Sequence, residues 1–279
     1  MKGCLFFDVD GTLVNSAIGE IVPNENVMNA IHQAQENGYL CFISTGRNLG
    51  GISELRDLGF DGYVFSDGGG IKLEGKDSIL TPIPESVLKE WYDQVVKYKA
   101  EVILSCEHML FATQGQYQEI LDTVHKAHME SGVNEQELLN AWNMKPVKEY
   151  DGSPIIACDM SFENEDIENQ WLKEKSPELD YVCTSASYGR GGATTGELTY
   201  QGVNKGVGCI NMTKLCGCDL NNTYAFGDSM NDASMFKTCT HSIAMGNAAE
   251  ELKNMAEYIT DDIDRDGIVS ALKYFGIIE

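Results

Sequence analysis

Residues 4–12 read Cys-Leu-Phe-Phe-Asp-Val-Asp-Gly-Thr, a short apolar run that leads directly into two acids and a glycine. The run predicts a buried β-strand, and Gly11-Thr12 predicts a sharp turn after it. Carboxylates at the exit of a buried strand are costly to desolvate unless a cation neutralises them. Asp8 and Asp10 therefore indicate a hard metal ion and an acidic nucleophile beside an acid/base group, while a solvated Asp-Gly turn is the plainer alternative.

Strand-like and helix-like stretches alternate on both sides of this run. Continuous apolar strands separated by helical periodicity are typical of a parallel sheet that is covered on both faces. We therefore predict an α/β fold with a doubly wound, Rossmann-like parallel-sheet core. In the first half we expect strands at 4–7, 39–44 and 63–65 and helices at 24–37 and 48–58. After residue 200 we expect strands at 224–226 and 242–245 and helices at 207–216, from 232, from 248 and at 267–275.

The middle of the chain has a different rhythm, with adjacent strands and helices of its own. It opens with a predicted hairpin, 71–73 and 79–80, in a stretch rich in Gly and Pro. It closes on a flexible return made by Gly189, Gly191, Gly192 and Gly196. We place an inserted α+β domain at 83–189 and the core domain at 1–82 and 190–279.

Composition narrows the class of protein. The 279 residues carry a net charge of −23 and are 43% hydrophobic, which is ordinary globular composition. Basic residues do not cluster, so a nucleic-acid partner is not expected. No apolar run approaches the ~20 residues of a membrane span, and the amino-terminal run is too short for a signal peptide. We expect a cytoplasmic protein without a membrane partner.

The nine cysteines fit this location. Most lie in apolar runs and are expected to be reduced core residues; they include Cys4, Cys41, Cys158 and Cys183. Cys216-Gly217-Cys218 has no partner pair at zinc spacing, so we interpret it as a loop with two ordinary thiols.

Three further polar clusters stand at the ends of predicted strands or the starts of predicted helices. Ser44-Thr45-Gly46-Arg47 offers a hydroxyl and backbone N–H groups to an anion, or simply caps a helix. Lys205, in Asn204-Lys205-Gly206, could bind phosphate as a point charge or be a solvated surface lysine. Residues 227–232, Gly-Asp-Ser-Met-Asn-Asp, fit hard-metal ligation or an acidic helix start.

Together, the four clusters closely resemble the motifs of the haloacid dehalogenase superfamily. The α/β insertion between the second and third motifs resembles the Cof-type branch, whose members are mostly phosphatases of small metabolites. The likeness covers about 170 residues of the core, and the insertion is similar only in position and rhythm. Asp67-Gly68 departs from the Asn-Gly that the family often has there, which leaves the role of that loop open.

The resemblance implies a role for each motif residue. Asp8 would be the nucleophile and Asp10 the acid/base group. Mg²⁺ would be held by the Asp8 carboxylate, the Asp10 backbone carbonyl and Asp228, and Asp232 would orient this group rather than bind the ion itself. The phosphoryl oxygens would be held by Val9, Thr45, Gly46, Lys205 and Asn231.

The inserted domain would be a cap that selects the substrate, and Arg47 would brace the loop rather than contact substrate. Candidate substrate contacts in the cap are Glu107, His108, Tyr188 and Arg190, although the simpler interpretation of each is an ordinary exposed or packed residue. The expected function is Mg²⁺-dependent hydrolysis of small phosphorylated metabolites, sugar phosphates above all, through an aspartyl-phosphate, by a monomer or weak homodimer. The alternatives are a sugar phosphomutase that uses the same intermediate and a non-catalytic module that binds phosphometabolites.

Overall fold

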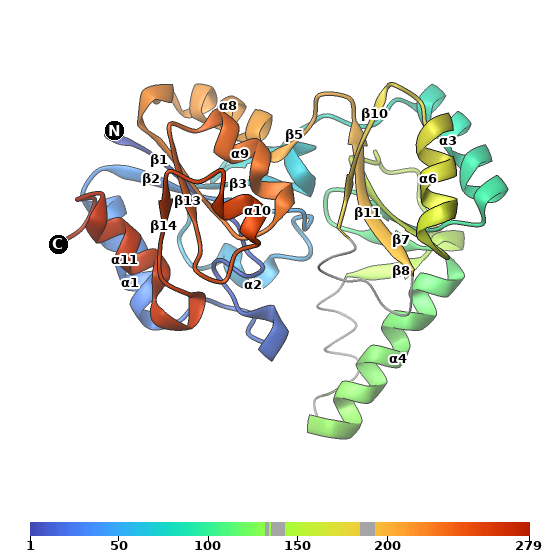
Figure 1. Ribbon diagram of the computed structural model, residues 1–279, viewed down its shortest axis with the longest axis horizontal. Helices are drawn as coiled ribbons and strands as arrows, with labels where there is room; N and C mark the ends of the chain where they lie inside the picture. The colour runs from blue at the N-terminus through green and yellow to red at the C-terminus, as the bar shows by residue number, and fades with distance from the viewer. Residues whose placement is uncertain (132–133, 135–142, 185–192) are drawn as a thin grey trace. The chain divides into compact units, whose positions relative to one another are not determined.

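The computed structural model describes residues 1–131, 134, 143–184 and 193–279, and they form two compact units. Unit 1 comprises residues 1–46, 52–79 and 204–279, and unit 2 comprises residues 47–51 and 80–203. Each unit has its own sheet (Figure 1). In the described part of the chain, none of the helices is long and apolar enough to cross a bilayer.

Unit 1 is built on a sheet in the order β14-β13-β12-β1-β2-β3-β4-β5. Its parallel strands are β1 (Gly3–Phe7), β2 (Tyr39–Ser44), β3 (Gly62–Phe65), β12 (Thr223–Gly227), β13 (His241–Ala244) and β14 (Tyr258–Ile259). β4 (Gly70–Leu73) adds to β3 in the antiparallel sense, and β5 (Ile79–Leu80) follows it at the edge. The doubly wound parallel sheet that the alternation predicts is therefore present.

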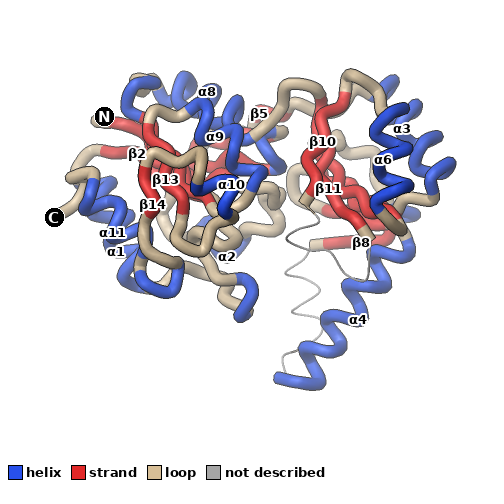
Figure 2. Tube along the Cα trace, in the orientation of Figure 1, coloured by secondary structure: helices blue, strands red, loops and turns tan. Residues whose placement is uncertain are grey.

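Helices cover both faces of this sheet (Figures 1 and 2). One face carries α8 (Lys205–Cys216) and α9 (Ala233–Thr238), which pack on each other, and the other carries α1 (Glu25–Glu36) and α11 (Gly267–Tyr274). The short helices are α2 (Ser53–Arg56) and α10 (Glu250–Lys253) and the 3-10 turns η1 (Ser16–Ile18), η2 (Ser66–Gly68), η4 (Leu220–Asn222), η5 (Met230–Asp232) and η6 (Ile263–Arg265). Every residue of β1 and β12 is buried, as expected for strands with helices on both sides.

Unit 2 is a mixed sheet in the order β10-β11-β9-β6-β7-β8. Its strands are β6 (Glu101–Ser105), β7 (Leu110–Ala112), β8 (Met144–Pro146), β9 (Ala157–Phe162), β10 (Leu179–Cys183) and β11 (Thr194–Tyr200). Its helices are α3 (Glu85–Tyr98), α4 (Gln114–Ser131) and α6 (Glu165–Glu174), with the 3-10 turn η3 (Val147–Glu149). α3 and α6 lie together on one face of the sheet and enclose an apolar core (Figure 1).

The return from the insertion differs from the expected flexible stretch. Gly196 lies within β11, where it pairs with Cys183 on one side and Met160 on the other. A Cβ at this position would stand 2.2 Å from the Tyr181 ring, so glycine is needed for close packing rather than for flexibility. β11 belongs to the sheet of unit 2, which therefore extends beyond the expected boundary at residue 189. The other three glycines of that stretch lie outside the described residues.

Two other expectations are corrected by the structure. The helix predicted over 48–58 is reduced to Ser53–Arg56, because Asn48 Oδ1 accepts the Gly51 N–H at 2.8 Å and forms a turn instead. Cys183, expected in the core, is exposed on the edge strand β10.

Candidate active site

The parallel arrangement brings Asp8 and Asp228 to the same edge of the sheet. β1 and β12 are paired in register from Cys4 with Thr223 to Phe7 with Phe226, so the two acids leave neighbouring strands together. The Asp8 N–H continues the ladder by donating to the Phe226 carbonyl at 3.0 Å. This is the edge at which ligands bind in open α/β sheets.

Lys205 joins these acids from the first turn of α8. Its Nζ donates to Asp8 Oδ1 at 2.7 Å and to Asp232 Oδ1 at 2.8 Å. All three side chains are buried, and Lys205 is only 1% exposed. The alternative of a solvated surface lysine is therefore wrong.

Asp232 is held by a set of hydrogen bonds of its own. While Oδ1 accepts from Lys205, Oδ2 accepts from the backbone N–H groups of Asp228 at 3.0 Å and Ser229 at 3.2 Å. The Ser229 hydroxyl donates to Asn231 Oδ1 at 2.7 Å in the same turn. Asp232 thus fixes the shape of the loop that carries Asp228, which is what an orienting residue must do.

Gly11 allows the loop after β1 to lie against Asp228. A Cβ at Gly11 would stand 2.3 Å from a carboxylate oxygen of Asp228, and the φ of +83° is one that side chains rarely adopt. Thr12 Oγ1 donates to Asp228 Oδ1 at 3.4 Å. The sequence showed both residues only as parts of a turn, because their contact with Asp228 spans more than 200 positions.

The carboxylates of Asp8, Asp228 and Asp232 form a group that could hold a metal ion, since one oxygen of each lies within 4.8 Å of the others. Burial raises the pKa of Asp8 well above its ordinary value; the charges of Asp232 and Asp228 add to this rise and Lys205 opposes it. Burial, and then the charge of Asp232, raises the pKa of Asp228 to about 7. One lysine is therefore too little positive charge for these acids, and their hard oxygens suit a divalent cation.

Lys205 itself stays charged. Desolvation lowers its pKa, but the carboxylates of Asp232 and Asp8, and the charge of Asp67, outweigh this effect and raise the pKa above its ordinary value. Asp67, whose role the sequence left open, therefore contributes negative charge near Lys205. It is buried after β3 with a φ of 51°, and its N–H donates to the Thr45 carbonyl at 3.1 Å.

The remaining motif residues follow strands β1 and β2, which are neighbours in the sheet. Thr45 and Gly46 follow β2, the neighbour of β1, and Thr45 is buried with its N–H bonded to the Val64 carbonyl at 2.9 Å. Asp10 is not part of the three-carboxylate group, although its charge adds to the rise in the pKa of Asp228. The carbonyl of the buried Val9 accepts the N–H groups of residues 12–14, which closes a turn after β1 that contains Asp10.

The structure describes some of the unit 2 residues that were expected to contact substrate or to brace the loop after Gly46. Arg47 Nη1 donates to the Gly51 carbonyl at 3.1 Å, a contact that a bracing role needs. Glu107 and His108 lie in the turn between β6 and β7, with His108 Nε2 at 3.6 Å from Glu107 Oε1. Tyr188 and Arg190 lie outside the described residues.

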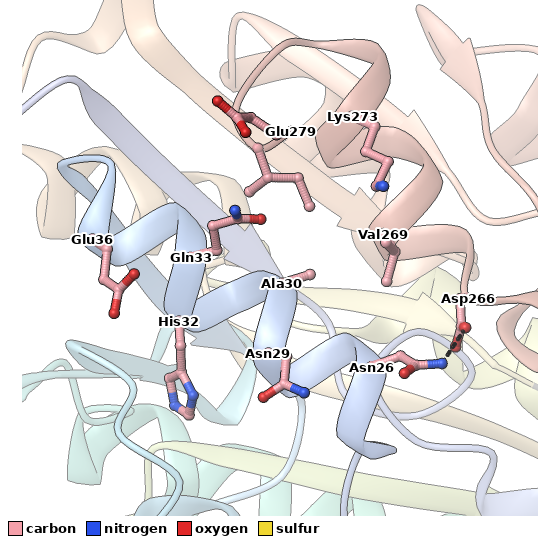
Figure 3. Close-up of a pocket in the computed structure, with 11 residues that line it drawn as sticks. Asn26, Asn29, Ala30, His32, Gln33, Glu36, Asp266, Val269, Lys273 and Glu279 are labelled. Atoms are coloured by element: carbon pink, nitrogen blue, oxygen red, sulfur yellow. Dashed lines mark hydrogen bonds between the residues drawn. The ribbon is translucent and has the colours of Figure 1, made fainter.

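A separate polar hollow of about 690 Å³ lies between α1 and α11 (Figure 3). Asn26 donates across it to Asp266 Oδ2 at 2.8 Å. Its lining contains none of the motif residues, so the hollow is distinct from the carboxylate group.

Comparison with known proteins identifies the family. The family model for haloacid dehalogenase-like hydrolases matches residues 5–272. The chain belongs to this family.

Similar haloacid dehalogenase-like hydrolases include curated phosphatases. The chain is 26% identical to the 5-amino-6-(5-phospho-D-ribitylamino)uracil phosphatase YcsE of Bacillus subtilis, over 96% of this chain and 93% of the relative. It is 27% identical to the phosphatase YwpJ of the same organism, over 96% and 97%. Among solved structures, the subclass IIB sugar phosphatase BT4131 has a TM-score of 0.76 at 29% identity, with coverage of 99% and 100%. The chain is a hydrolase of the phosphatase type within this family.

Proposed function

We propose that this phosphatase is a Mg²⁺-dependent phosphomonoesterase that hydrolyses small phosphorylated metabolites, sugar phosphates among them, through an aspartyl-phosphate on Asp8. The observation that carries the proposal is the buried Asp8 carboxylate, held by Lys205 at 2.7 Å beside Asp228 and Asp232. The names of the similar proteins, a sugar phosphatase among them, support this substrate class.

Mg²⁺ would be held by the Asp8 carboxylate, the Asp10 backbone carbonyl and Asp228. When bound, the ion neutralises negative charge and lets an anionic phosphate approach an anionic nucleophile. This need is large in a chain with a net charge of −23. Asp232 would not be a ligand, because both of its carboxylate oxygens already accept hydrogen bonds from the protein.

In the first step, an Asp8 oxygen forms a bond to phosphorus while the bond from phosphorus to the leaving oxygen breaks. Lys205 donates to Oδ1 of Asp8, so the other oxygen, Oδ2, would be the attacking atom. Asp10 donates its proton to the leaving oxygen, so the alcohol departs neutral. Burial of Asp8 removes the water that would otherwise shield the nucleophile.

In the second step, water attacks the phosphorus of the aspartyl-phosphate and the bond to Asp8 breaks. Asp10, now ionised, accepts a proton from this water, which restores both acids and releases inorganic phosphate. The phosphoryl oxygens would be held through both steps by the hydroxyl of Thr45, the backbone N–H groups of Val9 and Gly46, the third N–H of Lys205 and the amide of Asn231.

Unit 2 would act as the cap that selects the leaving group. Glu107 and His108 are the described candidates for contact with the part of the substrate beyond the phosphate. Arg47 would brace the loop after Thr45 and Gly46 through its bond to the Gly51 carbonyl.

The test is a screen of phosphorylated metabolites for release of inorganic phosphate, with Mg²⁺ and with a chelator. We expect release from sugar phosphates that depends on Mg²⁺. Asp8→Asn should lower turnover at least about 10,000-fold, because it removes the nucleophile. Asp93→Asn, an exposed acid on α3, is the matched control and should leave turnover unchanged.

The screen also separates the alternatives. Unchanged turnover in Asp8→Asn would exclude the aspartyl-phosphate. An isomerised sugar phosphate without free phosphate would identify a phosphomutase, and binding without turnover would identify a non-catalytic module.

A further inference from the structure

Three thiols gather at the end of β1 that lies away from Asp8. Cys4, in β1, is buried, and Cys216 and Cys218 are half-buried at the end of α8. The Sγ atoms of Cys4 and Cys216 are 3.7 Å apart, and all three Sγ atoms lie within 4.8 Å of one another. This cluster plays no part in the proposed hydrolysis.

The end of α8 explains how two cysteines so close in sequence reach the same point. Gly217 adopts the left-handed conformation, with φ 74° and ψ 24°, and ends the helix. Its N–H donates to the Lys214 carbonyl at 3.1 Å, and the Cys218 N–H donates to the Thr213 carbonyl at 3.0 Å. The chain reverses at this turn, so the thiols on either side of the glycine approach the same partner, Cys4.

The spacing of the sulfurs fits a metal ion better than a disulfide. In a tetrahedral site with Zn–S bonds of about 2.3 Å, two sulfurs lie about 3.8 Å apart. A disulfide needs about 2.05 Å and would leave the third thiol unused. Met1 Sδ, 3.9 Å from Cys218 Sγ, supplies a fourth soft donor next to the cluster.

We propose that Cys4, Cys216 and Cys218 form a binding site for a thiophilic d¹⁰ metal ion, Zn²⁺ or Cu⁺. Thiolate and thioether sulfur select these ions over Mg²⁺, which takes oxygen ligands. Cys216 and Cys218 lie close together in the sequence, but the third ligand cannot be recognised from the sequence because Cys4 lies 212 residues away from Cys216.

The site would fasten two elements whose other ends carry the chemistry. β1 runs from Cys4 towards Asp8, about 13 Å away at about 3.3 Å per residue. α8 runs about 17 Å from Lys205 to Cys216 at 1.5 Å per residue. The ion is therefore too far from the carboxylates to take part in hydrolysis, and its role is to hold the C-terminal end of α8 at Cys4 of β1. This inference does not depend on the proposed substrate.

The test uses the full chain, reduced and freed of metal, with Mg²⁺ in excess to occupy the carboxylates. We expect one Zn²⁺ or Cu⁺ per chain, and sulfur-to-metal charge-transfer absorption when Cd²⁺ is the probe, which carboxylate ligands cannot produce. Alkylation of the Cys216 and Cys218 peptides should slow when the ion is bound. At a free ion concentration of about 100 times Kd, Tm should rise by about 5–10 °C.

Variants localise the site. Cys216→Ser and Cys218→Ser should each abolish the charge-transfer band and the rise in Tm. Cys183→Ser, which removes an exposed thiol of unit 2, should change neither. Asp228→Asn should also leave both signals intact, since it alters only the carboxylate group.

Other results would overturn the proposal. Absence of the charge-transfer band would do so, and so would its loss in Cys183→Ser. Formation of a disulfide between Cys4 and Cys216, with no ion bound to the reduced protein, would show that the cluster is a redox pair instead.

Discussion

The two units treat buried charge in opposite ways. Unit 1 buries Asp8, Lys205 and Asp232 at one edge of its sheet, where they contact one another at 2.7 and 2.8 Å. Among the described residues of unit 2, the buried carboxylate is Glu168, whose Oε1 accepts the Tyr181 hydroxyl at 2.6 Å. The core around it is apolar, with Trp171 packed between Phe162 and Tyr181 at ring distances of 5.2 and 5.0 Å.

The difference shows that unit 1 accepts a cost in stability at the site where the reaction is proposed to occur. Desolvating several charges at one site lowers the stability of the fold, whereas one carboxylate that accepts a hydroxyl hydrogen bond beside an aromatic cluster costs less. The buried charges of unit 1 would then serve the reaction, and the buried side chains of unit 2 would serve packing. Substitutions should therefore lower the free energy of unfolding through lost charge pairing in unit 1 and through lost packing or hydrogen bonding in unit 2.

The largest effect is expected for Lys205→Met. Removing the cation leaves Asp8 and Asp232 buried without their partner, which should lower the free energy of unfolding by about 3–5 kcal/mol. Turnover should fall at least about 100-fold as well, since the proposed donor to the phosphoryl group is lost. Urea unfolding followed by circular dichroism, with hydrogen exchange of β1 and α8, measures the change. Lys237→Met, at an exposed position of α9, is the control. An equal fall in its free energy of unfolding would show that the effect of Lys205→Met does not come from buried charge.

Trp171→Ala should destabilise unit 2 by a similar amount without a charge being involved. The indole is fully buried between aromatic rings, and such truncations cost about 3–5 kcal/mol. Hydrogen exchange should show the loss in β9 and α6 and not in β1. Leu172→Ala, the next and partly exposed residue of the helix, should cost less than about 1 kcal/mol. Loss of protection in unit 1 as well would mean that the units do not unfold separately.

Tyr181→Phe should have a smaller effect. It removes the hydroxyl that bonds to Glu168 and leaves a buried carboxylate without this donor, at a cost of about 1–3 kcal/mol. Urea unfolding monitored in unit 2 gives the value. Tyr92→Phe, at a tyrosine that is 62% exposed, should be neutral. If the two variants were equally stable, the hydrogen bond would contribute nothing to this core.

The smallest change in stability is expected for Asp8→Asn, although its effect on turnover is severe. Burial raises the pKa of Asp8, which means that folding disfavours its ionised form, so a neutral side chain of the same shape should change the free energy of unfolding by less than about 1 kcal/mol. Lys205 keeps Asp232 as its partner. Thermal unfolding of the variant beside Asp93→Asn tests this. A large loss of stability would show that Asp8 is needed for the fold as well as for the reaction.

Local patterns in the sequence were enough to predict the parallel sheet, because buried strands and amphipathic helices leave their periodicity in the chain. They also predicted which polar residues stand at strand ends, as for Asp8, Thr45 and Asp228. The helix expected over 48–58 failed because Asn48 forms a turn, and β11 was missed because Gly196 was interpreted as flexible when Tyr181 packs over it.

The sequence by itself determined the sheet, the order of its motifs and the kinds of side chain that meet at its edge. Tertiary structure alone decided that Lys205 is buried between Asp8 and Asp232, that Gly11 lies against Asp228, and that Cys4 meets Cys216 and Cys218. The physical reason is distance along the chain. Hydrophobic periodicity depends on neighbours within a few residues, whereas desolvation of a charge and the spacing of ligand atoms depend on contacts between residues about 200 positions apart, which form only when the sheet closes.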